Sequence, residues 1–187
     1  HLAQYLALRG YRVLGLDLDP QASFTALHGL QPELDVAADA SLYNAIRYGQ
    51  ERRDMSDLVL RAYFDGLDIV PGNSDIQDFE HDVPKELMAR QSGRQTGESQ
   101  FYLRLKRAID QVENDYDLVV IDCPPQMGYL TMAALAASTS LIVTIHPAMV
   151  DVMSMSQFLH MTADYMRVIA ERGVKLQLNF ARYLVTR

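Results

Sequence analysis

The sequence predicts an α/β protein with a mostly parallel sheet and helices on both faces. The first observation is that apolar runs such as Leu118–Ile121 and Leu141–Ile145 do not alternate with polar residues, which is typical of parallel strands buried on both sides. The second is that segments with helical spacing separate these runs, as in sheets built from right-handed crossovers. The third is that two strands end in carboxylates, at Asp17 and at Asp122.

The first half of the chain predicts helices and strands in turn. A helix over His1–Arg9 ends at Gly10, because glycine readily takes the left-handed conformation that closes a helix. Ser23 is expected to cap a short helix that Gly29 and Pro32 end. The other expected elements here are strands over Tyr11–Asp17 and Leu67–Val70, a helix over Ser41–Tyr48, and a helix capped by Ser74 or Asp75.

The second half continues the same alternation. The polar run Gln91–Glu98 contains two glycines and predicts a loop. Two helices show apolar side chains at steps of three and four. The first carries Phe101, Leu105, Ala108 and Val112, and the second, from about Val150, carries Val152, Met155, Leu159, Thr162, Met166 and Ile169 on the face expected to meet the core. The remaining expected elements are strands over Leu118–Asp122, Ser140–Ile145 and Ala181–Val185 and a helix over Leu130–Ala137.

The composition limits the class of protein. A chain of 187 residues, 49% of them hydrophobic, can bury one sizeable core, so one domain is expected. The single cysteine excludes an internal disulfide framework and fits a reducing cytoplasm. The longest apolar runs are far shorter than the roughly 20 residues that span a bilayer, so no membrane partner is expected.

The charge is unevenly distributed along the chain. A formal net charge of −7 argues against a generally basic surface for nucleic acid. From Asp164 onward, however, basic residues outnumber acidic ones, and this end alone predicts a local surface for DNA, through Arg167, Arg172 and Lys175. The alternative for these three residues is an ordinary solvated helix face.

The carboxylates at the two strand ends are the candidate site. Asp17 and Asp19 are two residues apart, so they project to the same side of an extended chain, and Pro20 stops the strand. Asp122 follows a run of β-forming residues and is difficult to explain by packing alone. Open α/β sheets bind ligands at this edge, and Mg²⁺ prefers carboxylate oxygens. The alternatives are solvated acids in a turn for the first pair and a capping or ion-paired acid for Asp122.

Several motifs resemble a known family. Asp17-Leu18-Asp19-Pro20-Gln21 after a strand resembles the deviant Walker ATPases that segregate DNA, the ParA/MinD superfamily of phosphate-loop nucleotidases. Asp122-Cys123-Pro124-Pro125-Gln126 resembles a Walker B strand and its switch. Together with Phe79–Pro84, His146–Met155 and Arg182–Arg187, these motifs resemble the RepA-type plasmid partitioning proteins of repABC-type replicons over nearly the whole chain.

The resemblance implies ATP and Mg²⁺ as cofactors. It assigns Asp19 to the positioning or activation of the hydrolytic water, Asp122 to Mg²⁺, and Asp17 to a place nearer the metal and the phosphates. It also implies nucleotide contacts for the residues that follow both strands, where the second group senses the terminal phosphate. These residues are Pro20 and Gln21 after the first strand and Pro124, Pro125, Gln126 and Gly128 after the second.

One departure from the family pattern is informative. The phosphate-binding loop G-x-x-x-x-G-K-[ST] does not occur, and in the family it lies just before the helix that His1–Arg9 would finish. We therefore expect residues 1–187 to be part of an ATPase domain truncated at both ends, and inactive alone. The resemblance implies a cytoplasmic, nucleoid- or plasmid-associated ATPase. It would form a homodimer on binding ATP, bind DNA non-specifically, release it on hydrolysis, and work with a ParB-type centromere-binding protein.

Some alternatives stay open. A non-catalytic scaffold or regulator with this fold would keep the same strands, and a MinD-like cell-division-site or polysaccharide-synthesis ATPase would share the motifs. Cys123 has no base beside it and is interpreted as an inert side chain. His146 is expected either to face the nucleotide or a partner subunit or to be a hydrogen-bonded structural histidine. The methionines from Met149 to Met166 predict adaptable core packing, although in the family this segment lies near the dimer face.

Overall fold

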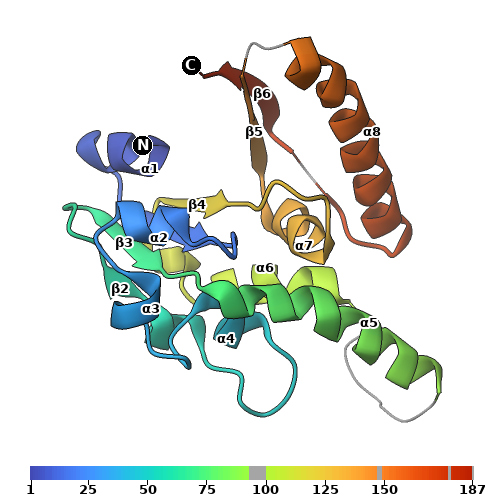
Figure 1. Cartoon of the computed structure of the whole chain (residues 1–187), viewed down its shortest axis with the longest axis horizontal. Coiled ribbons are helices and arrows are strands. Elements are labelled where there is room, and N and C mark those ends of the chain that lie inside the picture. Colours follow the sequence, from blue (N-terminus) through green and yellow to red (C-terminus); the bar gives the residue numbers. More distant parts are fainter. Residues whose placement is uncertain (93–99, 147–148, 177, 187) are drawn as a thin grey trace.

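The main sheet has four strands in the order β2-β3-β1-β4 (Figure 1). The computed structural model describes residues 1–92, 100–146, 149–176 and 178–186, and only the backbone of 149–155. Strand β1 (Val13–Asp17) pairs in parallel with β3 (Leu67–Val70) and β4 (Leu118–Asp122). The short β2 (Leu60–Arg61) runs antiparallel to β3. The predicted mostly parallel sheet is confirmed.

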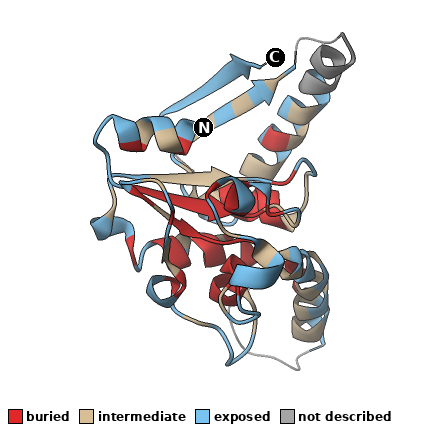
Figure 2. Cartoon of the chain, turned by 60° about the vertical axis from the view of Figure 1, so that its left-hand side comes forward, coloured by how far each residue is buried: buried red, intermediate tan, exposed pale blue. Residues whose placement is uncertain are grey.

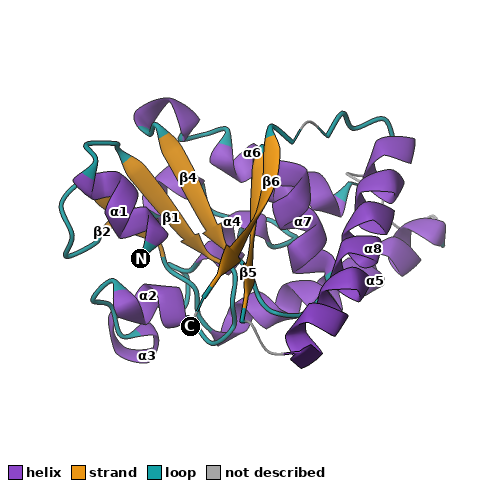
Figure 3. Ribbon diagram, turned by 90° about the horizontal axis from the view of Figure 1, so that it is seen from above, coloured by secondary structure: helices purple, strands orange, loops and turns teal. Residues whose placement is uncertain are grey.

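Helices cover both faces of this sheet (Figure 3). On one face lie α1 (Leu2–Leu8) and α2 (Ser23–Leu27). On the other face lie helices that share the larger apolar cluster with β1. These helices are α4 (Leu42–Ile46), α5 (Asp78–Gln91), α6 (Arg104–Ile109) and α7 (Tyr129–Ala137).

Every residue of β1 is buried, because successive side chains point to opposite covered faces. Leu14 and Leu16 join the cluster beneath α4 to α7, whereas Val13 packs with α1 and α2. At Gly15 a Cβ atom would lie 2.4 Å from the ring of Phe24 in α2. Glycine at this position therefore lets α2 lie directly on the sheet.

The last two strands form a separate sheet. Strand β5 (Ser140–Ile145) pairs in parallel with β6 (Phe180–Val185), and α8 (Met149–Glu171) connects them and packs against α7. All of β6 is exposed, whereas every residue of β1 is buried (Figure 2). β4 is exposed at Leu118 and half-buried from Val119 to Asp122, so the prediction that its apolar run is buried on both sides is wrong. The sequence predicts β5 and β6 but not their separation from the other four.

The predicted apolar face of α8 is only partly buried. Thr162 and Ile169 are buried, but Leu159 is 40% exposed, so the prediction that this whole stripe meets the core is wrong at Leu159. The side chains of Val152 and Met155 lie outside the described part of the chain, as does most of the predicted loop Gln91–Glu98. None of the described helices combines the length and the apolar character that a membrane span requires.

Several helix ends differ from the prediction. Ala22, not Ser23, is the residue before α2, in a left-handed conformation with φ of 50°. Pro32 begins the short helix α3 (Pro32–Asp35) instead of ending α2, because proline suits the first helical turn. Asn73 caps the 3-10 turn Ser74–Gln77 by accepting a hydrogen bond from the Asp75 N–H at 3.2 Å.

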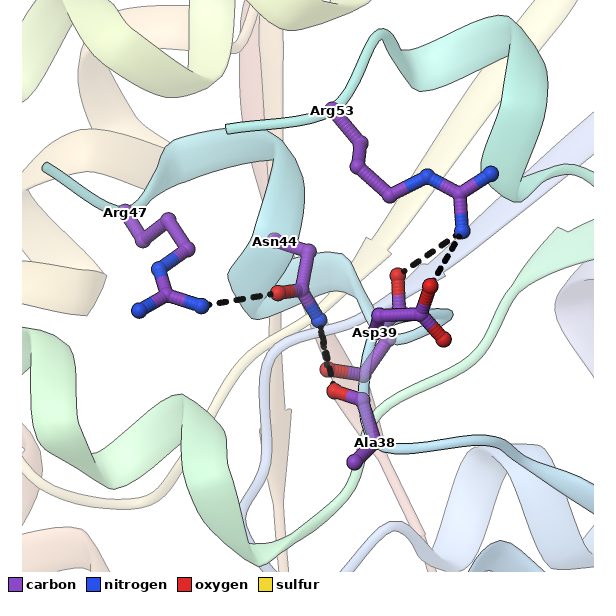
Figure 4. Close-up of polar contacts among 6 residues, drawn as sticks. Ala38, Asp39, Asn44, Arg47 and Arg53 are labelled. Carbon is purple, nitrogen blue, oxygen red and sulfur yellow. Dashed lines mark hydrogen bonds and ion pairs between the residues drawn. The ribbon is translucent and has the colours of Figure 1, made fainter. Parts of the chain in front are cut away.

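Polar contacts hold the segment around α4 (Figure 4). The Asn44 side-chain amide donates to the backbone carbonyl of Ala38 at 2.9 Å, and the Arg47 guanidinium donates to the Asn44 side-chain Oδ1 at 3.3 Å. Arg53 bonds both the carbonyl and the carboxylate of Asp39, at 3.2 and 3.0 Å. These bonds join the turn before α4 to the helix and to the segment that follows it.

Candidate functional site

The carboxyl ends of β1 and β4 meet at one edge of the main sheet. Asp17 and Asp122 are register partners on these adjacent strands, and the Leu18 N–H donates to the Asp122 carbonyl at 2.9 Å. Beyond the strand ends lies an open cavity of about 370 Å³. Its lining residues are Asp19, Pro20, Gln21, Gln77, Glu80, His81, Pro124, Pro125, Gln126, Gly128 and Leu130.

The structure brings together most of the residues predicted from the sequence. Those lining the cavity come from the loop after β1 and from the loop between β4 and α7, which are far apart in the chain. Asp17 and Asp122 are not among the lining residues, although they sit on the strands that deliver the loops. The predicted convergence of both strand ends is therefore present, and Asp19 is the one predicted carboxylate that lines the cavity.

Asp17 is fully buried and its carboxylate is occupied by hydrogen bonds. One oxygen accepts from the Thr25 N–H at 2.8 Å and from the Thr25 hydroxyl at 2.7 Å, and the other accepts from the Asp19 N–H at 3.2 Å. The Thr25 hydroxyl in turn accepts from the Gly72 N–H at 2.9 Å. Burial raises the pKa of Asp17, and these bonds oppose that rise. Asp17 thus joins β1, α2 and the turn after β3.

Asp19 and Asp122 have fewer contacts with the chain. Asp19 is half-buried and accepts one bond from the Gln21 N–H, at 2.9 Å. Burial, and then the charges of Asp17 and Asp19, raise the pKa of Asp122 to about 6. Three carboxylates thus repel one another at the end of the sheet. A bound cation is the usual means of relieving such repulsion, and carboxylate oxygens suit Mg²⁺.

The metal assignment stays a prediction. Among the residues that the structure describes, no group of three or more His, Cys, Asp and Glu side chains has the arrangement of a metal site. The donor chemistry of Asp19 and Asp122 nevertheless fits Mg²⁺, which commonly takes one or two protein carboxylates and completes its shell with water and phosphate oxygens. The bonds of Asp17 favour a structural task for that carboxylate over the direct metal contact expected from the sequence.

Besides Leu130 of α7, sequence reasoning missed three polar residues at the cavity, namely Gln77, Glu80 and His81. They belong to the 3-10 turn before α5 and to the first turn of α5. The motif Phe79–Pro84 carried part of the family resemblance, but no role was assigned to its polar residues. Nothing in local spacing links this motif to the loop after β4, so only the tertiary fold reveals the contact.

Other candidate residues lie outside the cavity. Desolvation of the sulfur, and then the charge of Asp122, raise the pKa of Cys123, which agrees with an inert thiol. His146 is exposed and its Nδ1 lies 3.4 Å from the Thr186 carbonyl, which favours the structural alternative. Met161 and Met166 are half-buried. The side chains of Met149, Met153 and Met155 lie outside the described residues.

The proposed DNA-facing residues are exposed at the carboxyl-terminal half of α8 and just beyond it. Arg167 pairs with Asp164 at 3.0 Å on the helix surface. Arg172 and Lys175 follow at and after the end of the helix. The structure agrees equally with a solvated face and with a surface for phosphate groups.

Comparisons with known proteins agree with this geometry. The model of the AAA domain family AAA_31 matches residues 1–174. "Putative replication protein A" of Rhizobium rhizogenes is 52% identical over 187 residues, which are all of this chain and 45% of that protein. The chain therefore spans a little under half the length of this curated relative.

Two solved structures share the fold. Cobyrinic acid a,c-diamide synthase from Mycobacterium smegmatis with bound ADP and magnesium has a TM-score of 0.77 at 26% identity, covering 97% of this chain and 65% of that one. A plasmid partition protein from Borrelia burgdorferi has a TM-score of 0.73 at 19% identity, covering 100% of this chain and 70% of that one. The second likeness is one of fold alone.

Proposed function

The chain belongs to the AAA domain family and is related to the plasmid partition proteins of the ParA/MinD superfamily. On this basis we propose that it is part of an ATP-hydrolysing plasmid partition protein. In the proposed cycle, ATP closes a homodimer that binds DNA, and hydrolysis releases the DNA. The observation that carries the proposal is the convergence of the two acid-ended strands, β1 and β4, on one cavity.

The proposed roles follow from the contacts of each carboxylate. Asp19 lines the cavity, and among the described residues one of its carboxylate oxygens accepts a hydrogen bond, from the Gln21 N–H. The other oxygen can therefore accept a hydrogen bond from an attacking water. Asp122 has a raised pKa and is proposed to hold Mg²⁺, whose charge would offset the repulsion from Asp17 and Asp19. When bound, Mg²⁺ neutralises charge on the phosphates of the nucleotide. Asp17 contributes its charge and fixes the geometry of the strand end.

The walls of the cavity support a nucleotide-sensing role for the neighbouring loop. Pro124, Pro125, Gln126 and Gly128 face the same space as Asp19, Pro20 and Gln21. A terminal phosphate placed there would contact both loops at once. The loop after β4 is thus proposed to sense whether that phosphate is present.

The phosphate-binding loop itself is proposed to come from residues outside this chain. β4 lies at the end of its sheet, and β5 pairs only with β6 among the described strands, so each has an edge that could accept another strand. The greater length of the curated relative leaves room for such a segment. On this proposal the chain alone binds ATP poorly, because the backbone N–H groups that cradle phosphates are not in it.

The proposed partners are DNA, a second copy of the protein and a ParB-type centromere-binding protein. The exposed residues Arg167, Arg172 and Lys175 supply positive charge for phosphate groups, and phosphate contacts carry no sequence information. This matches a cytoplasmic protein that associates with plasmid or nucleoid DNA. The dimer and the centromere-binding partner rest on the family relation.

Substitutions at Asp19 and Asp122 in the longer protein test the proposed function. Asp19→Ala is expected to slow single-turnover ATP hydrolysis by about 10²-fold while leaving Mg²⁺-ATP binding nearly intact, because only the water loses its partner. Asp122→Ala is expected to weaken binding and its Mg²⁺ dependence, because a metal ligand is lost. Equilibrium nucleotide titration and rapid-quench hydrolysis measure the two effects.

A matched control is Asp57→Ala, which removes an exposed carboxylate from the 3-10 turn Met55–Leu58. It is expected to change neither binding nor hydrolysis. Hydrolysis at the parent rate in Asp19→Ala, or the same binding defect in both site variants, would contradict the assigned roles. A wild-type protein that binds ATP without hydrolysing it would favour the non-catalytic scaffold instead.

A further inference from the structure

Glu80 of α5 caps the first turn of α7, a different helix. Its two carboxylate oxygens accept hydrogen bonds from the N–H groups of Tyr129 and Leu130, at 2.9 and 2.8 Å. The first N–H groups of a helix have no partner within the helix, and a carboxylate there is also favoured by the helix dipole. Gly128, the residue before α7, has no side chain to act as a cap, and the first turn of α7 contains no acid. Glu80 thus supplies from α5 what α7 lacks.

The packing at Gly128 shows how closely Glu80 approaches. A Cβ atom on residue 128 would lie 2.4 and 2.7 Å from the two carboxylate oxygens of Glu80. The φ of Gly128 is −122°, which any residue adopts, so glycine is needed here for space and not for backbone conformation. The glycine at position 128 therefore leaves room for the Glu80 carboxylate beside the start of α7.

The loop that Glu80 contacts forms one wall of the candidate site. Pro124, Pro125, Gln126 and Gly128 line the cavity, and so does Glu80 itself. Two more bonds hold the same loop at its centre. The Thr131 hydroxyl donates to the Gln126 carbonyl at 2.6 Å, and the Tyr165 hydroxyl of α8 donates to the Met127 carbonyl at 2.8 Å.

These bonds give the loop two attachments from distant parts of the chain. Glu80 fixes its end from α5, and Tyr165 fixes its centre from α8. A buried or half-buried carboxylate that accepts two backbone bonds is among the stronger contacts a loop can have. A shift of α5 relative to α7 must therefore move the cavity wall or break both bonds.

We propose that Glu80 is a positioning residue of the candidate site, which holds the Pro124–Gly128 loop against Asp19 so that the chemical step depends on the placement of α5. This inference rests on the proposed function, since it assigns Glu80 to the hydrolysis carried out at that site. Glu80 acts through the backbone of α7 and the loop, and it does not itself transfer a proton. Misplacing a positioned group by about 1 Å can cost up to 10²-fold in rate.

The test compares Glu80→Gln with Asp78→Asn in the longer protein. Glu80→Gln keeps the size of the side chain but replaces one acceptor oxygen and removes the charge. Asp78→Asn removes an exposed carboxylate from the same turn of the same helix, so it controls for the charge of α5. We expect kcat for ATP to fall about tenfold in Glu80→Gln with KM within about twofold of wild type, and neither to change in Asp78→Asn.

A second readout does not depend on hydrolysis. Amide hydrogen exchange at Tyr129 and Leu130 is expected to accelerate in Glu80→Gln, because one N–H loses its acceptor and the other keeps only a neutral amide oxygen, and to stay unchanged in Asp78→Asn. If Glu80→Gln does not fold, Tyr165→Phe serves instead. It releases the loop from α8 at the Met127 carbonyl and is expected to lower kcat with the same KM.

The outcomes separate this inference from the proposed function. A wild-type protein without ATP hydrolysis overturns the proposed function and the catalytic role of Glu80 together. Normal wild-type turnover with unchanged kcat in Glu80→Gln overturns this inference alone, even if amide exchange accelerates, because the cap would then be purely structural. A parallel rise in KM would also overturn it, by showing that Glu80 affects binding and not the chemical step.

Discussion

The β1-centred sheet and the β5-β6 sheet are built in the same way but differ in how they are covered. Both contain parallel strands with apolar side chains. All residues of β1 are buried, whereas all residues of β6 are exposed. The difference lies in the helices around them, since β1 has α1 and α2 on one face and α4 to α7 on the other. An apolar strand sequence therefore specifies a strand but not its burial.

The two sheets also differ in how much they contribute to the stability of the fold. The hydrophobic free energy of folding scales with the apolar area removed from water, so most of it comes from the β1-centred sheet and its helices. The candidate site lies where the fully buried β1 and the half-buried β4 end side by side. The β5-β6 sheet contributes less to stability, because the side chains of β6 stay exposed to solvent.

A matched pair of leucine substitutions gives the largest expected effect. Leu16→Ala in β1 is expected to lower the free energy of unfolding by about 3 kcal/mol, because Leu16 is fully buried and a cavity remains. Leu184→Ala in β6 is expected to cost less than about 1 kcal/mol, because Leu184 is 51% exposed. Urea unfolding followed by circular dichroism measures both. Equal losses would show that β6 is buried in solution and would break the comparison.

The sequence could predict local elements of this molecule but not the contacts between distant parts of the chain. The bounds of β4 and β5 match the predicted strands residue for residue, because a run of β-formers between turn signals is a local pattern. The two-residue β2 was missed, since it is too short to show a period. The separation of the strands into two sheets depends on pairing between distant residues, which no local pattern contains.

The site residues were likewise predicted where a local pattern marked them and missed where only a distant contact did. Asp19, Pro20 and Gln21 after β1 and Pro124, Pro125, Gln126 and Gly128 after β4 were predicted because each follows a recognisable strand end, and all of them line the cavity. The predicted residues Asp17 and Asp122 do not line it and lie at the strand ends. Glu80 was missed because its partners are 49 and 50 residues away along the chain. The cap assigned to Ser23 was wrong because the Asp17 carboxylate at the end of β1 accepts the hydrogen bond from the Thr25 N–H instead.

The two ends of β4 are expected to respond oppositely when a carboxylate is removed. Burial raises the pKa of Asp122 to about 6, so its ionisation opposes folding. Its stabilising contribution is complete below the unfolded pKa of about 4 and is lost as the pH rises through about 6. Asp122→Asn is therefore expected to stabilise this chain at pH 7.5, by roughly 2 kcal/mol, and to flatten the pH dependence of stability between about pH 4 and 6.

Asp117, just before β4, is the control with the opposite sign. A bidentate contact with Arg12 lowers the pKa of Asp117, so its stabilising contribution is present at neutral pH and is lost as the pH falls through the lowered value. Asp117→Asn is expected to destabilise the chain slightly at pH 7.5. Thermal unfolding of both variants at pH 4.5 and 7.5 measures the effects. A loss of stability in Asp122→Asn at pH 7.5 would contradict the site electrostatics described here.

The smallest expected change in stability is at the exposed end of α8, where function is expected to change instead. Replacing Arg167, Arg172 and Lys175 together by Ala should alter the free energy of unfolding by less than about 0.5 kcal/mol per residue, because all three are exposed and Arg167 forms only a surface ion pair. In the longer protein the same triple variant should weaken non-specific DNA binding. The slope of the logarithm of the DNA-binding constant against the logarithm of salt concentration should fall in magnitude by about one unit for each lost phosphate contact, because fewer counterions are released. Titration of labelled duplex DNA at several salt concentrations measures the slope, with Asp57→Ala as a control that leaves it unchanged. An unaltered slope in the triple variant would assign these residues to a solvated face, and the exposed region would then lack the DNA contact proposed for it.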